Sequence, residues 1–230
     1  MSIKYKSIVP WGRSFKEYCG MFKLTKADFN LKILGCGDGP ASFNVEMYKL
    51  TKKVVSVDPI YQFTTNQIQK RINETYKEVL KQTQKNKDKF IWKNFTSVEE
   101  LGKTRLQSMQ KFLIDFEDGK KQGRYIYAEL PNLPFKNHEF DLALSSHFLF
   151  LYSDHLSLQF HIAAIKEMLR VAKEVRIFPL VDLNAKKSPY VEQIIAEFNN
   201  DNFSAKEIKV NYEFQKMADK MLVIKCLGLN

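Results

Sequence analysis

The sequence has few cysteines and no long hydrophobic run. Only Cys19, Cys36 and Cys226 occur among its 230 residues, and their odd number and wide spacing indicate neither a disulfide framework nor a zinc site. The longest apolar stretch, around residues 148–152, is far too short to span a bilayer. The N-terminus also lacks the apolar region of a signal peptide. These absences predict a cytoplasmic protein without a membrane segment or a metal site.

No segment combines low hydrophobicity with a long run of like charge, so no part of the chain is predicted to be disordered. With 44% apolar residues the chain can bury one substantial core. A single domain, residues 1–230, is therefore expected at this length.

The net charge of +10 is concentrated in two segments. Residues 1–33 carry seven Lys or Arg against two Asp or Glu, and residues 61–123 carry thirteen against eight. Such a surface can attract phosphate or acidic partners, RNA included. The alternative is a pair of solvated lysine-rich helix faces. The second interpretation is favoured because lysine outnumbers arginine and no arginines alternate with aromatic residues.

Alternation of strand and helix patterns begins after an N-terminal helical segment, residues 1–30. A short apolar run at 31–34 predicts a buried strand, residues 41–50 a helix, and residues 54–57 a second strand. Strand, helix and strand in this order form a βαβ unit, so the sheet should be parallel.

Residues 61–123 are predicted to be a helical insertion that packs on the sheet. One helix spans residues 65–82, with apolar residues at four-residue spacing. A second begins at Ser97, which forms a capping box with Glu100, and ends near Gly119.

The strand and helix pattern then resumes. An open parallel sheet closed by an antiparallel hairpin accounts for the order. Strands are predicted at 125–127, 140–145, 175–180, 205–212 and 221–225. Helices are predicted after Asp154, which can cap the first of them, and at 190–198.

A glycine-rich turn, Leu34-Gly-Cys-Gly-Asp-Gly-Pro40, joins the first strand to its helix. Glycine lets a ligand lie against the backbone, and the helix N-terminus behind it offers free N–H groups. Pro40 stands where a dinucleotide fingerprint needs its third glycine, which disfavours a nicotinamide or flavin cofactor.

Two acidic residues also stand at the carboxyl ends of predicted strands. Asp58 ends the second strand, where an acid can reach ribose hydroxyls, and Glu129 follows the third, where it can accept from an adenine amino group. Alternatively, Asp58 is a turn cap before Pro59 and Glu129 an exposed loop carboxylate. Their order favours ligand binding, because open α/β sheets bind ligands at the carboxyl ends of their strands.

The segments ILGCGDGPASF, VVSVDP, AELPNLPFKNHEFDLALSS and IKEMLRVAKEVRIFPL resemble the class I S-adenosylmethionine-dependent methyltransferases, most closely an uncharacterised bacterial subgroup. The resemblance covers most of residues 31–180. It implies an α/β fold with a Rossmann-like seven-stranded methyltransferase sheet, an antiparallel last strand and, here, the helical insertion after the second strand. It also implies S-adenosylmethionine as the cofactor.

The resemblance implies roles for individual residues. Asp58 would hold the ribose, Glu129 and the backbone of Leu130 would frame the adenine, and Ser145 and Ser146 would line the methionine side. The expected cofactor-binding residues are Gly35, Cys36, Gly37, Gly39, Asp58, Pro59, Glu129, Leu130, Ser145, Ser146 and Arg13.

One feature departs from the family. An acid usually precedes the glycines and helps to hold the amino-acid moiety of the cofactor, but Gly35 or, in the other register, Ile33 stands there. Asp38 is a candidate for a partial substitute. Arg13 would pair with the cofactor's carboxylate if the segment with Trp11 and Tyr18 closes over it; otherwise these aromatic residues only cover the sheet edge.

The methyl acceptor is not specified by any motif. His147, Tyr152 and His155 are candidate bases, with His147 the catalytic candidate, although a core or rim histidine is the favoured interpretation. No Asn-Pro-Pro-Tyr-type motif or Pro-Cys nucleophile is present, which argues against amino-group methylation of bases and against cytosine C5 chemistry.

Three functions therefore stay open. They are a small-molecule methyltransferase, an RNA or protein methyltransferase that docks through the basic insertion, and a non-catalytic S-adenosylmethionine-binding protein. The first predicts a partly enclosed cavity bounded by the N-terminal segment, the insertion and residues 145–155.

Overall fold

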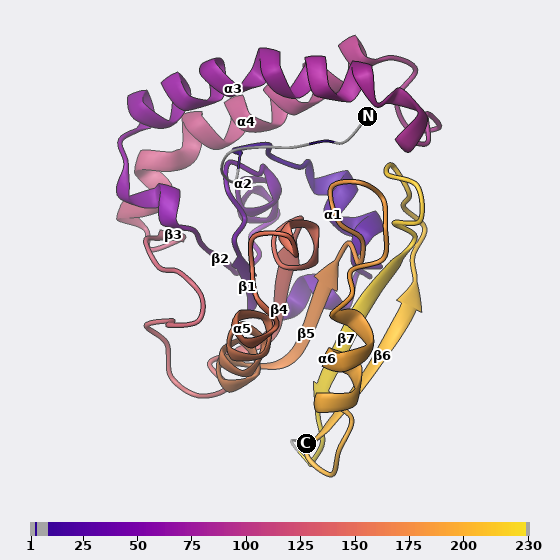
Figure 1. Ribbon diagram of the computed structural model, residues 1–230. Coiled ribbons are helices and arrows are strands. Elements are labelled where there is room, and N and C mark those ends of the chain that lie inside the picture. The colour runs from indigo at the N-terminus through magenta and orange to yellow at the C-terminus, as the bar shows by residue number, and fades with distance from the viewer. Residues whose placement is uncertain (1–2, 4–8, 229–230) are drawn as a thin grey trace.

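The computed structural model describes residue 3 and residues 9–228, so part of the predicted N-terminal segment lies outside the described residues. Its centre is one seven-stranded sheet with the order β3-β2-β1-β4-β5-β7-β6 (Figure 1). The first five strands are parallel, and β7 is antiparallel to both of its neighbours. The predicted α/β sheet and its closing antiparallel hairpin are thus confirmed. The strands are β1 (Ile33–Cys36), β2 (Val54–Val57), β3 (Tyr125–Ile126), β4 (Phe140–Ser146), β5 (Ala172–Phe178), β6 (Phe203–Lys209) and β7 (Lys220–Cys226).

Helices cover both faces of the sheet, and a long helical hairpin, α3 and α4, lies across the end to which the parallel strands point (Figure 1). The α-helices are α1 (Phe15–Met21), α2 (Phe43–Lys49), α3 (Thr65–Lys85), α4 (Val98–Lys121), α5 (Leu158–Val171) and α6 (Val191–Glu197). Short 3-10 helices span Asp28–Asn30, Pro59–Gln62, Lys87–Lys89 and Phe150–Tyr152.

An aromatic cluster fixes the insertion, residues 61–123, to the sheet edge. Phe112 and Phe116 of α4 pack with Tyr61 around Tyr125 of β3, with ring centroids 4.9 to 5.8 Å apart. All four side chains are almost fully buried. Aromatic rings are the most effective side chains for burying apolar area, so this contact holds the hairpin in place.

A polar junction adds to this attachment. The guanidinium of Arg124, the residue before β3, donates to both carboxylate oxygens of Asp115 on α4, at 2.6 and 2.8 Å. It also donates to Asn44 of α2, whose amide in turn donates to the Val54 carbonyl of β2. One bidentate pair therefore ties the insertion to the βαβ unit.

One predicted capping box and one predicted helix cap were wrong. Ser97 caps α4 as expected, but Glu100 accepts from the backbone N–H and hydroxyl of Thr96 and not from Ser97, so the capping box is not formed. The cap of α5 is Ser157, not Asp154. Asp154 lies in the turn after a 3-10 helix that the sequence pattern did not reveal.

Another difference is the start of β5. It begins at Ala172, directly after α5, and not at Val175. Within the described residues, no helix combines the length and apolarity that crossing a membrane requires.

Candidate functional site

A cavity of about 770 Å³ opens where the parallel strands end. This is a typical volume for a small-molecule site. Its walls come from the N-terminal segment, the insertion and the segment after β4, as predicted from the sequence, and also from the glycine-rich turn.

The glycine-rich turn between β1 and α2 forms one wall. Gly37 and Gly39 have φ of +69° and +54°, a conformation that favours glycine. A Cβ on Gly37 would press on the ring of Phe148 at 3.2 Å, whereas a Cβ on Gly39 would have only Asp58 Oδ2 nearby, at 3.9 Å. The backbone of Gly39 therefore has open space in front of it.

Asp58 links the ends of β1 and β2. Its Oδ2 accepts from the Gly39 N–H at 2.8 Å, and its Oδ1 accepts from the Ile60 N–H at 2.9 Å. Burial raises the pKa of Asp58 to about 6, although these two hydrogen bonds favour the charged form. Both expected roles are thus compatible, because the carboxylate caps the turn and the residue also lines the cavity.

Asp38, within the glycine-rich turn, is buried but still lines the cavity. It accepts from the Tyr18 hydroxyl at 2.8 Å and from the Ser56 hydroxyl at 2.6 Å. Its carboxylate fills the space next to Gly35, so that a Cβ on Gly35 would overlap it. Burial, with a contribution from the charge of Asp58, raises the pKa of Asp38 to about 6.

Glu129 and Leu130 form the opposite wall, after β3. Glu129 is exposed and Leu130 is buried. The carbonyl of Glu129 accepts from the Asn132 N–H at 2.9 Å, which closes a tight turn and leaves the Glu129 carboxylate at the cavity rim.

His147 follows β4 with a left-handed φ of +54°, an uncommon conformation for a residue with a side chain. Its N–H donates to the Phe178 carbonyl at 2.7 Å, and its Nδ1 lies 2.9 Å from the Ser146 hydroxyl. Burial lowers the pKa of His147 well below its usual range, and the positive charges of Arg13 and Arg105 lower it further. The ring is therefore neutral at pH 7.

The structure brings most of the predicted site residues to this one cavity. Those that line it are Arg13, Gly37, Gly39, Asp58, Pro59, Glu129, Leu130, Ser146 and His147. Trp11, Tyr18 and Tyr152 line it as well.

Four predicted residues do not line the cavity: Gly35, Cys36, Ser145 and the alternative base His155. Gly35 lies within the sheet between Ser56 and Leu144, and Cys36 is fully buried in the core. Ser145 is fully buried, because successive residues of a strand point to opposite faces and Ser146 takes the cavity side.

A buried charged cluster next to the site was not predicted from the sequence. Glu17 of α1 pairs with Arg105 of α4 and accepts from the Tyr212 hydroxyl at 2.7 Å. These three residues are far apart in the chain, and only the Ser14 cap with Glu17 has a local signature, a capping box.

No protein-family model matches the chain. The chain is 35% identical over 224 residues to the uncharacterized protein MJ0045 of Methanocaldococcus jannaschii, covering 97% of this chain and 98% of that protein. The chain belongs to the MJ0045 family. This relative is archaeal, so the expected placement in a bacterial subgroup has no support.

Solved structures resemble the chain more distantly. A SAM-dependent methyltransferase from Aquifex aeolicus is 11% identical with a TM-score of 0.42, over 91% of this chain and 92% of that one. The magnesium protoporphyrin IX methyltransferase of Synechocystis PCC 6803, crystallised with bound SAM, is also 11% identical with a TM-score of 0.42, over 85% and 70%. Likeness at this level assigns no substrate to members of the MJ0045 family.

Proposed function

We propose that this protein is an S-adenosylmethionine-dependent methyltransferase with a small-molecule acceptor. The observation that carries the proposal is the single cavity that Gly39, Asp58 and Glu129 share at the carboxyl ends of adjacent parallel strands. In open α/β sheets this is where a nucleoside binds.

The residues present fit an adenosine. Gly39 leaves room at the backbone that a side chain would fill, and Asp58 beside it offers acceptors to ribose hydroxyls. Glu129 at the rim and Leu130 beneath it match the polar edge and the apolar face of an adenine.

Asp38 fits the amino-acid end of the same ligand. It supplies a buried carboxylate at the turn where the acid usual in class I methyltransferases is missing. It reaches that place because Gly35 has no side chain. Bound there, the ammonium of the methionine moiety would give Asp38 the cationic partner that the described residues do not provide.

When bound, S-adenosylmethionine supplies an already activated methyl group, so orientation of the acceptor and exclusion of water account for much of the rate. His147 borders the cavity next to Ser146 and would take a proton from an acceptor that must lose one. In the tautomer that carries its hydrogen on Nδ1, the ring donates to the Ser146 hydroxyl, which would orient it and leave Nε2 free to accept that proton.

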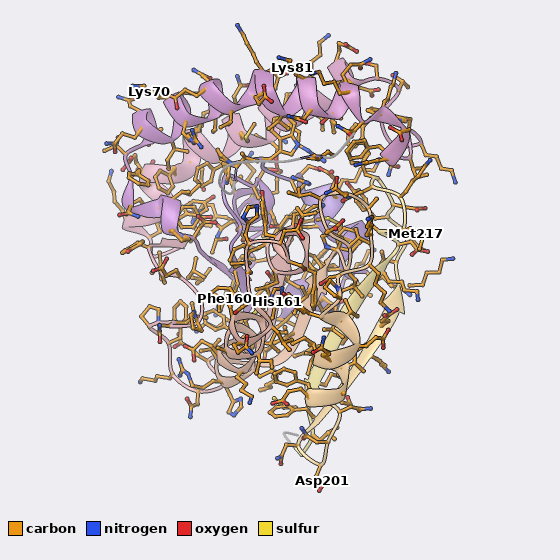
Figure 2. All side chains as sticks on the ribbon, in the orientation of Figure 1. Lys70, Lys81, Phe160, His161, Asp201 and Met217 are labelled. Carbon is orange, nitrogen blue, oxygen red and sulfur yellow. The ribbon has the colours of Figure 1, made fainter. Side chains whose placement is uncertain are left out.

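The insertion favours a small acceptor over a polymer. Its inner side lines the cavity with apolar side chains, among them Ile68, Val79 and Leu101. The exposed lysines Lys70 and Lys81 lie on the outer side of α3 and point away from the sheet (Figure 2). A polyanion bound to those lysines would be separated from the cavity by the helix itself.

A transfer assay tests the proposal. Purified protein is incubated with methyl-tritiated S-adenosylmethionine and a cell extract separated into metabolites, RNA and protein. Label in the metabolite fraction supports the proposal, and label confined to RNA or protein contradicts the small acceptor. Binding of S-adenosylmethionine without transfer to any fraction would indicate the non-catalytic alternative.

A further inference from the structure

A buried cluster beside the cavity has more positive than negative charge. It contains Glu17 from α1, Arg105 from α4 and the half-buried Arg13 from the N-terminal segment. Arg105 is completely buried and Glu17 is 6% exposed. The cluster thus contains two guanidinium groups and only one carboxylate, and a buried charge without a partner is unfavourable.

Glu17 is hydrogen-bonded to other groups and not to Arg13. One of its oxygens accepts from Arg105 and from the backbone N–H and hydroxyl of Ser14, and the other accepts from Tyr212. Among the described residues no carboxylate is hydrogen-bonded to Arg13. The guanidinium charge of Arg13 is therefore available to a ligand.

Several donors of the two arginines are unused. Arg13 donates from Nη1 to the Trp11 carbonyl, but its Nε is buried without a partner. Nε and Nη2 of Arg105 are likewise buried without a partner, while its guanidinium lies 5.5 Å from the centre of the Phe95 ring. Such donors are normally satisfied in folded proteins.

Arg13 is also held in place at the cavity wall. Its carbonyl accepts from the Ser42 N–H at 3.0 Å and from the Ser108 hydroxyl at 2.8 Å. Ser42 precedes α2 and Ser108 belongs to α4, so the backbone of Arg13 is fixed between the glycine-rich turn and the insertion. A preorganised arginine with free donors is suited to a planar oxyanion.

We propose that Arg13, supported by the buried charge of Arg105, is an anion subsite of the cavity and binds a carboxylate or phosphate group of the ligand. The anion has two sources. One is the carboxylate of the methionine moiety, which rests on the proposed function, and the other is an acidic group on the methyl acceptor. Both supply the negative charge that the Arg13, Arg105 and Glu17 cluster lacks.

Calorimetry with defined probes tests the subsite. The nucleoside probes are S-adenosylhomocysteine and 5′-methylthioadenosine, which lacks the amino-acid moiety. The anionic probes are benzoate and inorganic phosphate, with benzyl alcohol as the uncharged match, each titrated into free and nucleoside-saturated protein. The variants are Arg13→Met, Arg13→Lys to retain the charge, and Lys16→Met as an exposed control in the same segment.

If the cofactor supplies the anion, Arg13→Met lowers the affinity for S-adenosylhomocysteine at least tenfold and leaves the affinity for 5′-methylthioadenosine unchanged. If the acceptor supplies the anion, Arg13→Met leaves the affinity for S-adenosylhomocysteine unchanged. Benzoate or phosphate then binds the wild-type and Lys16→Met proteins but not Arg13→Met. Arg13→Lys retains part of either effect. The subsite is refuted if no probe distinguishes Arg13→Met from wild type.

The two proposals fail separately. If neither nucleoside binds the wild-type protein, the methyltransferase proposal fails. The anion subsite is then decided by whether benzoate or phosphate binds the free wild-type protein more tightly than Arg13→Met.

Discussion

The carboxylate of Asp38 occupies the space that a side chain on Gly35 would need. Gly35 lies inside β1, where φ does not require glycine, so the requirement is one of space. Tyr18 and Ser56 hold Asp38 in that position by hydrogen bonds of 2.8 and 2.6 Å. The acid of this turn is therefore tied to the glycine three residues before it, whose missing side chain makes room for the carboxylate.

This relationship predicts coupling between the two positions. Gly35→Ala should lower the free energy of unfolding by about 1–3 kcal/mol, because the new methyl group displaces a buried, hydrogen-bonded carboxylate. In an Asp38→Ala background the same substitution should cost markedly less, because the space is vacant. Urea denaturation of the four proteins measures the coupling, and additive effects would contradict it.

Asp38→Asn should separate the two ends of the nucleoside ligand. The amide keeps the size of the carboxylate but loses the charge that attracts an ammonium group. The affinity for S-adenosylhomocysteine should fall by about 1–3 kcal/mol, while that for 5′-methylthioadenosine should not change. Asp201→Asn, at an exposed position far from the cavity (Figure 2), is the matched control. An equal loss for both ligands would show that Asp38 only supports the turn.

The raised pKa of Asp58 predicts a particular dependence of stability on pH. Its pKa is about 6 in the folded protein against 3.8 as the usual value, so between these values the folded state binds the proton more tightly. Its contribution to stability is therefore complete below about pH 3.8 and is lost as the pH rises through 6. The contribution of Asp38 to stability changes with pH in the same direction, because its pKa is also raised to about 6. Glu17 contributes to stability in the opposite direction, because its pKa is lowered to about 2. Its stabilising contribution is lost only as the pH falls toward 2, outside the range in which Asp58 acts.

Asp58→Asn should remove the contribution of Asp58 to this dependence. Relative to the variant, the wild-type protein should gain about 1 kcal/mol in the free energy of unfolding from pH 7 to pH 5. Urea denaturation at both pH values measures the difference, with Asp201→Asn as control. A difference that does not change with pH would contradict the burial of an ionisable Asp58.

The charges of Arg13 and Arg105 predict how His147 responds to substitution. Both lower its pKa, after burial as the main cause. Arg13→Met should therefore raise the pKa of His147, while Lys16→Met should leave it unchanged. NMR titration of the ring resonances of His147 measures both. An unchanged value in Arg13→Met would mean that Arg13 lies too far from His147 to share a ligand with it.

Local patterns predicted the parts of the fold that rest on local chemistry. The βαβ unit and the position of Asp58 could be predicted because apolar runs ending in glycine or in Asp-Pro mark buried strands and their carboxyl ends. The cap of α5 was misassigned, because a 3-10 helix (Phe150–Tyr152) takes up the chain before Ser157.

Contacts between distant segments could not be predicted. Glu17 meets Arg105 and Tyr212 only because α1, α4 and the segment after β6 pack together, and no spacing in the sequence encodes that. The place of Asp38 beside Gly35 is local, but it depends on Tyr18 and Ser56, which come from α1 and β2.

Calorimetric titration of the wild-type protein and Asp58→Ala with S-adenosylhomocysteine tests the central claim most directly. The account predicts one bound molecule per chain, and an affinity that falls by about 1–3 kcal/mol in Asp58→Ala because ribose hydroxyls lose their acceptor. Absence of binding to the wild-type protein, or equal affinities of the two proteins, would contradict it.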